Sequence, residues 1–229
     1  MITESVKMRK LNLFFKRTFD IVVSVVALLM FTIVPVMIVV PIVIKLTSKG
    51  PAIFTQTRIG KNGKPFVMYK FRTMITERYD KKGTEIMSED RITKIGKILR
   101  KTSLDELPQL FNVLNGTMSI IGPRPMLDYQ APRCIDEENI RFDMRPGLTG
   151  YAQVKGRNNI IWEERIQYDI EYIKTFTFWL DMKILIKTVL LVFKKQGTEV
   201  KAEYRGVSRF SKYYVPEDEQ TPAIVESER

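Results

Sequence analysis

The chain contains no histidine and a single cysteine, Cys134. Without histidine it cannot form a Ser-His or Cys-His catalytic arrangement, and the usual histidine-containing zinc sites are excluded as well. One cysteine cannot form an intramolecular disulfide, which favours a reducing compartment. Any catalytic chemistry must therefore rely on carboxylates, lysine, arginine, tyrosine or that one thiol.

Acidic residues are fewer than basic residues. Lys and Arg number 37 and Asp and Glu 26 among the 229 residues, so the net charge is +11. This sign favours an anionic partner, and nucleic acid, anionic lipid and a phosphorylated substrate all fit it. The sequence also lacks the G-x-G-x-x-G and Walker patterns, which argues against a Rossmann or P-loop nucleotide site.

Residues 21–44 form a long run without charge. As one straight helix this run would be about 36 Å long, enough for a bilayer core, so we predict that it inserts into the membrane. Basic residues lie at both ends, and a single span would place one basic end outside, against the positive-inside tendency. Pro35 would interrupt the helix near its middle, and Thr32 offers a hydroxyl to the freed backbone groups. We therefore predict a re-entrant hairpin, preceded in residues 1–17 by a basic amphipathic segment on an anionic membrane surface.

Residues 52–74 predict a β-hairpin, because two strand-like runs flank Asn62-Gly63, a strong turn signal. Lys70 and Arg72 share one face of the second run. They form either a solvated strand face or a cationic wall over a phosphate. Residues 77–90 lack an apolar period and predict a loop of the length often found over sites. Residues 91–100 predict a short basic helix.

The adjacent acids Asp105 and Glu106 lie in residues 98–114, where apolar residues recur at helical spacing. Ser103 and Glu106 have the spacing of a capping box, so helix capping alone explains the acids. The alternative is catalytic, because Arg100 precedes the acids and Arg124 follows them between two prolines. Arginines near a helix N-terminus favour phosphate binding, and carboxylates beside phosphates indicate a metal ion or covalent chemistry. The residue types leave both interpretations open.

The last third of the chain predicts loops and helices. Residues 145–158 are glycine-rich and basic, and their glycines permit a close approach of the backbone to a ligand, although loops without ligands look similar. Residues 162–173 predict a helix rich in Glu and Tyr. Residues 176–195 combine aromatic and basic residues on an amphipathic helix, which is typical of a segment in the membrane interface.

These segments predict an α/β (α+β) fold, with a re-entrant membrane helix hairpin before a compact cytoplasmic domain that carries a β-hairpin and interfacial amphipathic helices. The expected boundaries are a basic amphipathic lead-in at 1–17, the membrane helix at 18–47, the catalytic domain at 48–205 and a disordered acidic tail at 206–229.

Six motifs occur in the same order as in a known family. They are Lys16-Arg-Thr-Phe-Asp20, Tyr69-Lys-Phe-Arg-Thr-Met74, Ser103-Leu-Asp-Glu-Leu-Pro-Gln-Leu-Phe-Asn-Val-Leu114, Gly122-Pro-Arg-Pro125, Arg145-Pro-Gly-Leu-Thr-Gly150 and Gly156-Arg-Asn158. Over roughly residues 14–197 the chain resembles the bacterial sugar transferases, the monotopic polyprenyl-phosphate phosphoglycosyl transferases that include the bacillosamine-phosphate enzyme. It is similar to their small form, in which no additional membrane bundle precedes the anchor. Relatives often bend the membrane helix at a Ser-Pro pair, whereas this chain has Val34-Pro35.

The resemblance implies transfer of a sugar-1-phosphate from a UDP-sugar to polyprenyl (undecaprenyl) phosphate, with release of UMP, at the first membrane step of glycoconjugate assembly. It implies Asp105 as the nucleophile that forms an aspartyl-phosphosugar intermediate, Glu106 as its partner, and Mg²⁺ at Asp105 and the pyrophosphate. The residues expected to bind the substrates lie in the matched motifs and are Lys70, Arg72, Arg100, Arg124, Arg145, Gly147, Gly156, Arg157 and Asn158. The implied location is the bacterial inner membrane, with a monotopic anchor and the catalytic domain on the cytoplasmic face.

A non-enzymatic membrane scaffold that binds anionic lipid is the alternative function. It explains the charge and the amphipathic segments but neither the Pro-Arg-Pro turn nor the placement of the two acids. We expect no nucleic-acid partner, because the chain offers no platform of exposed aromatics with interleaved arginines. A homodimer, or later glycosyltransferases of the pathway, are the further partners that we consider, and the sequence does not identify the sugar.

Overall fold

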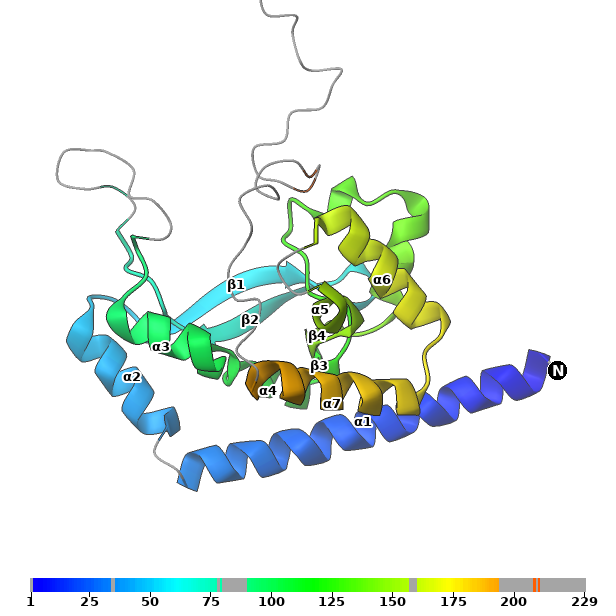
Figure 1. Cartoon of the computed structure of the whole chain (residues 1–229), viewed down its shortest axis with the longest axis horizontal. Coiled ribbons are helices and arrows are strands. Elements are labelled where there is room, and N and C mark those ends of the chain that lie inside the picture. Colours follow the sequence, from blue (N-terminus) through cyan, green and yellow to red (C-terminus); the bar gives the residue numbers. More distant parts are fainter. Residues whose placement is uncertain are drawn as a thin grey trace, which may run out of the picture.

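The computed structural model describes residues 2–33, 36–77, 79, 90–156, 160–193, 208 and 210. Figure 1 shows a long helix, α1 (Ile2–Ile33), along one side of the molecule, with two small sheets and most of the other helices gathered above it. A second helix, α2 (Val36–Thr47), follows α1 and rises at an angle to it in Figure 1, toward α3 (Lys94–Thr102). The mixed helix and sheet class predicted from the sequence is confirmed.

The sequence predicts a helix break at Pro35, and the structure gives two helices on either side of it, α1 to Ile33 and α2 from Val36, which run at an angle to each other in Figure 1. Pro35 lies outside the described residues, and Thr32 lies in the last turn of α1. Within the described residues, no helix combines the length and the apolar character needed to cross a membrane. Two successive helices of different direction are observed, whereas the re-entrant hairpin and its insertion into a membrane stay predictions.

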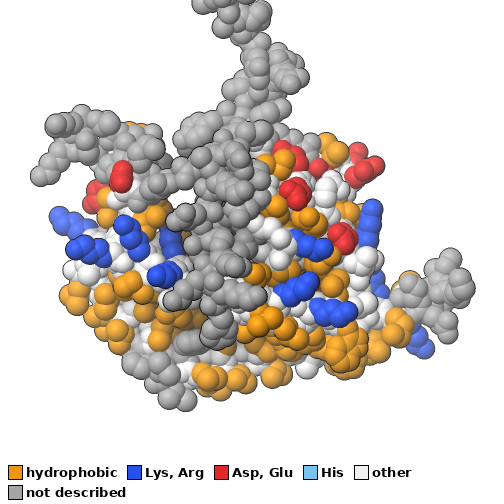
Figure 2. Space-filling view, in the orientation of Figure 1, with side chains coloured by type: hydrophobic (Ala, Val, Ile, Leu, Met, Phe, Trp, Pro, Cys, Tyr) orange, Lys and Arg blue, Asp and Glu red, His pale blue; other side chains and the backbone are white. Residues whose placement is uncertain are grey.

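Apolar side chains gather along the lower edge of the molecule in Figure 2, where α1, α2 and α7 (Phe178–Phe193) lie in Figure 1. Helices of a globular domain normally turn such residues toward the core. A contiguous apolar surface is typical of a face that meets a protein or a membrane. The exposed large hydrophobic residues on these three helices include Phe14, Val22, Leu29, Ile38, Ile42, Trp179, Ile186 and Leu190.

Helix α1 is fastened to the domain by buried polar side chains. The Lys16 Nζ donates to Asp181 Oδ2 at 2.7 Å and to a carbonyl of strand β3 (Ser119–Ile121) at 2.6 Å. An N–H of the same strand donates to Asp20 Oδ1 at 2.9 Å, and the Tyr172 hydroxyl donates to Asp181 Oδ1 at 2.7 Å. All four of these side chains are buried. Lys16, one of the basic residues of the segment 1–17 that the sequence predicts on a membrane surface, is therefore buried against the domain and paired with Asp181.

The predicted β-hairpin is confirmed. Strands β1 (Ile53–Ile59) and β2 (Pro65–Phe71) pair antiparallel, with Ile53 opposite Phe71. The turn contains Asn62 at φ 58° and Gly63 at φ 71°, both in the left-handed region. Asn and Gly tolerate that region better than other residues, which is why Asn-Gly predicts the turn.

A second, parallel pair joins β3 to β4 (Gly147–Thr149). The two backbones lie so close that a Cβ on Gly147 would sit 2.1 Å from the Gly122 nitrogen. The glycine at position 147 is therefore needed for packing of one chain segment on another, whatever its role toward a ligand.

Helix α3 (Lys94–Thr102) is the predicted basic helix, and the Gly96 N–H donates to the capping Thr93 Oγ1 at 2.9 Å. The predicted capping box at Ser103 is wrong. Ser103 is left-handed at φ 57°, it ends α3, and its side chain caps nothing. Residues Leu104–Glu106 form a 3-10 helix, and α4 (Gln109–Leu114) begins only after Pro108. Proline has no N–H to bond back to residue 104, so one continuous α-helix cannot form here.

The remaining elements are short 3-10 helices at Ala131–Arg133 and Asp136–Asp143, followed by α5 (Tyr151–Gly156) and α6 (Trp162–Lys174). The helices predicted over residues 162–173 and 176–195 are confirmed as α6 and α7. The main core collects apolar residues from α1, β2, α4, β3, α6 and α7, among them Leu28, Met68, Val113, Ile121, Tyr172 and Ile184. In the segment 206–229, expected to be a tail, the structure describes only Ser208 and Phe210, and both are buried.

Candidate functional site

The two adjacent acids lie in the tight 3-10 turn between α3 and α4. The Lys70 Nζ, from β2, donates to Glu106 Oε1 at 2.6 Å. The side chains of this ion pair are 18 % and 30 % exposed, so the pair is open to a ligand. The hairpin therefore brings the Lys70 cation directly to the acidic pair. The cationic wall over a phosphate stays a prediction.

The environment of Asp105 makes it the less acidic of the two carboxyls. Burial and the neighbouring Glu106 charge raise the pKa of Asp105 to about 6, although Lys70 and Arg100 act in the opposite direction. A pKa near neutrality is typical of groups that take part in proton transfer or nucleophilic chemistry. At pH 7 most of the Asp105 carboxyl is still ionised.

The pKa of Glu106 shifts in the opposite direction. Burial alone would raise the pKa of Glu106, but the charges of Lys70 and Arg124, with hydrogen bonds from Lys70 and Gln109, lower it below its usual value. The adjacent carboxyls thus have pKa values pushed apart, and such a separation allows two acids to take different roles.

A pocket opens beside Glu106. Its charged and polar lining comes from the hairpin, the acidic turn, α4 and the Pro-Arg-Pro turn, namely Arg58, Lys70, Glu106, Gln109 and Arg124. Met68, Pro125, Gly147 and Leu148 complete the lining. Cations outnumber carboxylates in this lining. The arrangement suits a ligand with several negative charges, such as a diphosphate.

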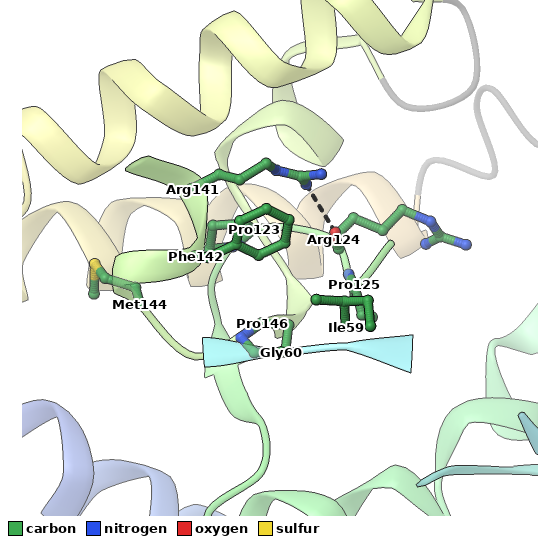
Figure 3. Close-up of a pocket in the computed structure, with 9 residues that line it drawn as sticks. All are labelled: Ile59, Gly60, Pro123, Arg124, Pro125, Arg141, Phe142, Met144 and Pro146. Carbon is green, nitrogen blue, oxygen red and sulfur yellow. Dashed lines mark hydrogen bonds between the residues drawn. The ribbon is translucent and has the colours of Figure 1, made fainter. Parts of the chain in front are cut away.

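The backbone of Arg124 is held from behind by a buried ion pair. Arg141 donates to the Arg124 carbonyl at 2.9 Å and to Asp169 Oδ2 at 2.7 Å, and both side chains of the pair are 1 % exposed. Figure 3 shows the small apolar pocket behind this turn, with the guanidinium of Arg124 pointing away from Phe142. The turn thus fixes the backbone of Arg124 between two prolines, while its side chain lines the pocket beside Glu106.

Arg100 and Arg72, two further predicted site residues, lie outside the lining of this pocket. Arg100 donates from Nε to Thr73 Oγ1 at 2.9 Å, and its charge acts on Asp105. Arg72 is buried and donates to the Ser48 carbonyl and hydroxyl at 2.8 and 2.7 Å, so it ties β2 to the end of α2. Neither arginine lines the pocket.

Arg145 and Gly156 also lie away from the pocket lining. Arg145 donates from Nε to the Gly116 carbonyl at 2.7 Å, and burial and the Arg17 charge lower its pKa. Gly156 ends α5, where a Cβ would sit 2.3 Å from the Ile160 side chain. Arg157 and Asn158 lie outside the described residues.

Sequence reasoning missed Arg58 and Gln109 in the pocket. A signal for Arg58 was available, because directly paired residues of a hairpin share a face and alternate along each strand. Phe54 pairs with Lys70, so Arg58, four residues further along β1, returns to the face of Lys70. Gln109 had no such signal, since its burial depends on how α4 packs.

The described residues contain no group of three or more His, Cys, Asp or Glu side chains that could hold a metal ion. Mg²⁺ in phosphate-handling sites is commonly held by one or two carboxylates together with substrate phosphates and water. Asp105, beside a pocket suited to phosphates, fits that pattern as a ligand of an ion that arrives with the substrate.

Comparison with known proteins identifies the family. The family described as bacterial sugar transferase matches residues 11–195. The chain is 42 % identical over 184 residues to the uncharacterized sugar transferase EpsL of Bacillus subtilis, covering 80 % of this chain and 90 % of the relative.

Two longer relatives have named activities. A UDP-glucose:undecaprenyl-phosphate glucose-1-phosphate transferase of Klebsiella pneumoniae is 44 % identical over 192 residues, with 80 % of this chain and 41 % of the relative covered. An undecaprenyl-phosphate galactose phosphotransferase of Salmonella typhimurium is 39 % identical over 205 residues, again with 80 % and 41 % covered. The chain thus spans about two fifths of the length of these two relatives. Because the family matches most of the chain and the motifs occur in its order, this chain belongs to the bacterial sugar transferases.

Proposed function

We propose that this chain transfers a sugar-1-phosphate from a UDP-sugar to a polyprenyl phosphate and releases UMP, as the first membrane step in the assembly of a glycoconjugate. The observation that carries the proposal is the pocket in which Glu106 meets Lys70, Arg58 and Arg124, directly beside Asp105. Relatives named as undecaprenyl-phosphate sugar phosphotransferases support the substrate classes.

Asp105 acts as the nucleophile. Its ionised carboxylate attacks the phosphorus that carries the sugar, and the bond from that phosphorus to the bridging oxygen of UMP breaks. UMP leaves with the electron pair, and an aspartyl-phosphosugar remains on Asp105. An oxygen of the polyprenyl phosphate then attacks the same phosphorus, which regenerates the carboxylate and gives a polyprenyl diphosphate-linked sugar.

The cations of the pocket stabilise the charge that develops on the phosphates. Arg124 and Lys70 line the pocket together with Glu106, and such preorganised charges lower the barrier of phosphoryl transfer. Glu106, ionised and fixed by Lys70, orients the groups around Asp105. A Mg²⁺ ion held by Asp105 and the substrate phosphates would neutralise further charge on the diphosphate.

The acceptor is a lipid, so the reaction requires a site near a membrane surface. The exposed apolar residues of α1, α2 and α7 support a monotopic arrangement in which these helices enter one leaflet and the catalytic domain stays on the cytoplasmic face of the bacterial inner membrane. The break between α1 and α2 supports a re-entrant anchor with both ends on that face.

A turnover assay tests the proposal. UMP release is measured from a panel of UDP-sugars with Mg²⁺ and undecaprenyl phosphate in detergent, for the wild-type chain and for Asp105→Asn. We expect turnover with at least one sugar and a loss of at least about 1,000-fold in Asp105→Asn, because the amide is no nucleophile. Asp136→Asn, an exposed acid at the start of the 3-10 helix Asp136–Asp143 and outside the pocket lining, is the matched control and should keep wild-type activity. Normal turnover by Asp105→Asn would refute the covalent mechanism.

A further inference from the structure

Arg58 presents a cation to the pocket from the carboxyl end of β1. Its guanidinium is held in place by two hydrogen bonds, from Nη2 to Gln56 Oε1 at 2.8 Å and from Nη1 to the Pro125 carbonyl at 3.3 Å. The Nε is buried and has no hydrogen-bond partner among the described residues. The guanidinium is thus oriented against the Pro-Arg-Pro turn and keeps donor capacity that the protein does not use.

The charge around Arg58 is not balanced. In the part of the chain that the structure describes, the ion pairs are Lys16–Asp181, Lys70–Glu106 and Arg141–Asp169, so no carboxylate lies within ion-pair distance of Arg58 or Arg124. Burial and the neighbouring Arg124 charge lower the pKa of Arg58 to about 10, while the charges of Tyr129 and Asp128 act in the opposite direction. Two guanidinium groups that face one pocket repel each other unless an anion lies between them.

Lys70 does not relieve this repulsion, because it is a third cation and its charge is already matched by Glu106 at 2.6 Å. An anion that enters the pocket therefore meets two arginines without a carboxylate partner in the described residues, together with the Lys70–Glu106 pair, whose charges match each other. Arginine is the residue best suited to hold a phosphate at such a place, because its planar donors match two phosphate oxygens at once.

We propose that Arg58 is a substrate-binding residue, and that its guanidinium and that of Arg124 together hold one phosphoryl group of a substrate beside Asp105 and Glu106. The proposal rests on the function proposed above and adds a residue from the β-hairpin to it. The phosphoryl group belongs either to the diphosphate of the nucleotide sugar or to the monophosphate of the lipid acceptor, since both present the same oxygens.

A purely structural role is the alternative. The bond from Arg58 to the Pro125 carbonyl, together with the Ile59 N–H bond to Met126 at 3.0 Å, fastens the hairpin to the turn. If that were the whole role, a substitution would lower stability without changing the affinity for either phosphate substrate.

The test compares Arg58→Gln with the wild-type chain and with Lys61→Gln, which removes an exposed cation from the turn of the same hairpin. KM is measured separately for the UDP-sugar and for undecaprenyl phosphate, and binding of UDP is measured by calorimetry in the absence of acceptor. We expect a KM for one of the two substrates to rise about 10- to 100-fold in Arg58→Gln, the effect of losing a charged hydrogen-bond donor to phosphate, and to stay unchanged in Lys61→Gln.

The measurements distinguish the two sources of phosphate. A higher KM for the UDP-sugar with weaker UDP binding assigns Arg58 to the donor diphosphate. A higher KM for undecaprenyl phosphate with unchanged UDP binding assigns it to the acceptor. If both KM values and UDP binding match the wild type, the proposal is overturned, whatever happens to the melting temperature.

Two further arms keep the test decisive. If Arg58→Gln does not fold, Arg58→Lys replaces it, and a rise of about 3- to 10-fold in one KM is expected because the two-point contact is lost; two unchanged KM values would again overturn the proposal. If the wild-type chain turns over no UDP-sugar, the proposed function fails, and binding of inorganic pyrophosphate then tests Arg58 directly. Weaker binding by Arg58→Gln would support the anion site, and equal binding would refute it.

Discussion

Two lysine–carboxylate pairs in this molecule have almost the same geometry and very different surroundings. Lys16 lies 2.7 Å from Asp181, with side chains 7 % and 2 % exposed, whereas Lys70 lies 2.6 Å from Glu106, with side chains 18 % and 30 % exposed. The first pair joins α1 to α7 inside the domain. The second pair lies at the wall of the pocket.

The difference between the pairs lies in what surrounds them. Around Asp181 the hydroxyl of Tyr172 donates to the free carboxylate oxygen, and Lys16 also reaches a carbonyl of β3, so the groups satisfy one another. Around Glu106 the neighbours are a second acid with a raised pKa and two arginines without carboxylate partners in the described residues. The same ion pair therefore fixes a helix in one place and marks a site for an anionic ligand in the other.

Substitution of Lys16 should have the largest effect, a loss of stability. In Lys16→Met the Asp181 carboxylate stays buried without its cation, and loss of one partner of a buried pair costs about 3–5 kcal/mol of unfolding free energy. We expect the melting temperature in detergent, followed by circular dichroism, to fall by roughly 10 °C. The matched variant Lys70→Met should change stability by less than about 1 kcal/mol, because its pair is partly exposed, while turnover falls.

A double variant provides the control for this prediction. Lys16→Met combined with Asp181→Leu removes both charges and should recover part of the lost stability, since no uncompensated buried charge remains. Equal melting temperatures for Lys16→Met and Lys70→Met would show that the two pairs do not differ as described.

The pH dependence of UMP release tests the surroundings of the second pair, because it reports the pKa of Asp105. Because burial and Glu106 raise the pKa of Asp105 to about 6, the carboxyl is protonated below that pH and cannot attack. The rate should therefore rise with pH through about 6 and level off above 7, with a value at pH 5 about tenfold below that at pH 8. Glu106 has a lowered pKa and stays ionised over this range, so one transition is expected.

This measurement should use single-turnover UMP release without acceptor, because a phosphate monoester such as the lipid acceptor itself titrates near pH 6. Circular dichroism at each pH confirms that the chain stays folded. A rate that is flat down to pH 4.5 would mean that Asp105 ionises like an ordinary aspartate, and the role assigned to its surroundings would be wrong.

Local signals in the sequence predicted the parts of the fold that local interactions decide. Asn62-Gly63 predicted the hairpin because those residues occupy the left-handed conformations that the turn contains. The capping box failed although its spacing was correct, because Pro108 stops an α-helix from running through the acids and Ser103 ends the preceding helix instead. Spacing alone does not reveal which helix a capping residue belongs to.

Local sequence patterns did not predict the contacts between segments that are distant in the chain. The basic residues of α1 suggested a membrane surface, but the partner of Lys16 is Asp181, 165 residues away. The ordered motifs predicted a site at Asp105 and Glu106, and the structure places a pocket beside Glu106. The lining of that pocket depends on tertiary packing of the hairpin, the Pro-Arg-Pro turn and α4, which the motifs do not reveal. Arg72 and Arg145 were expected to bind substrate because of their residue type and motif. In the structure neither lines the pocket, and their guanidinium groups donate to the Ser48 and Gly116 carbonyls.

The measurement that tests the central claim most directly is a search for the covalent intermediate. The wild-type chain is incubated with its UDP-sugar and Mg²⁺ without acceptor, quenched, digested and analysed by mass spectrometry. The account predicts a sugar-phosphate adduct on the peptide that contains Asp105, its disappearance when undecaprenyl phosphate is added, and its absence from Asp105→Asn. Full turnover without any adduct on Asp105, or an adduct that persists in Asp105→Asn, would contradict it.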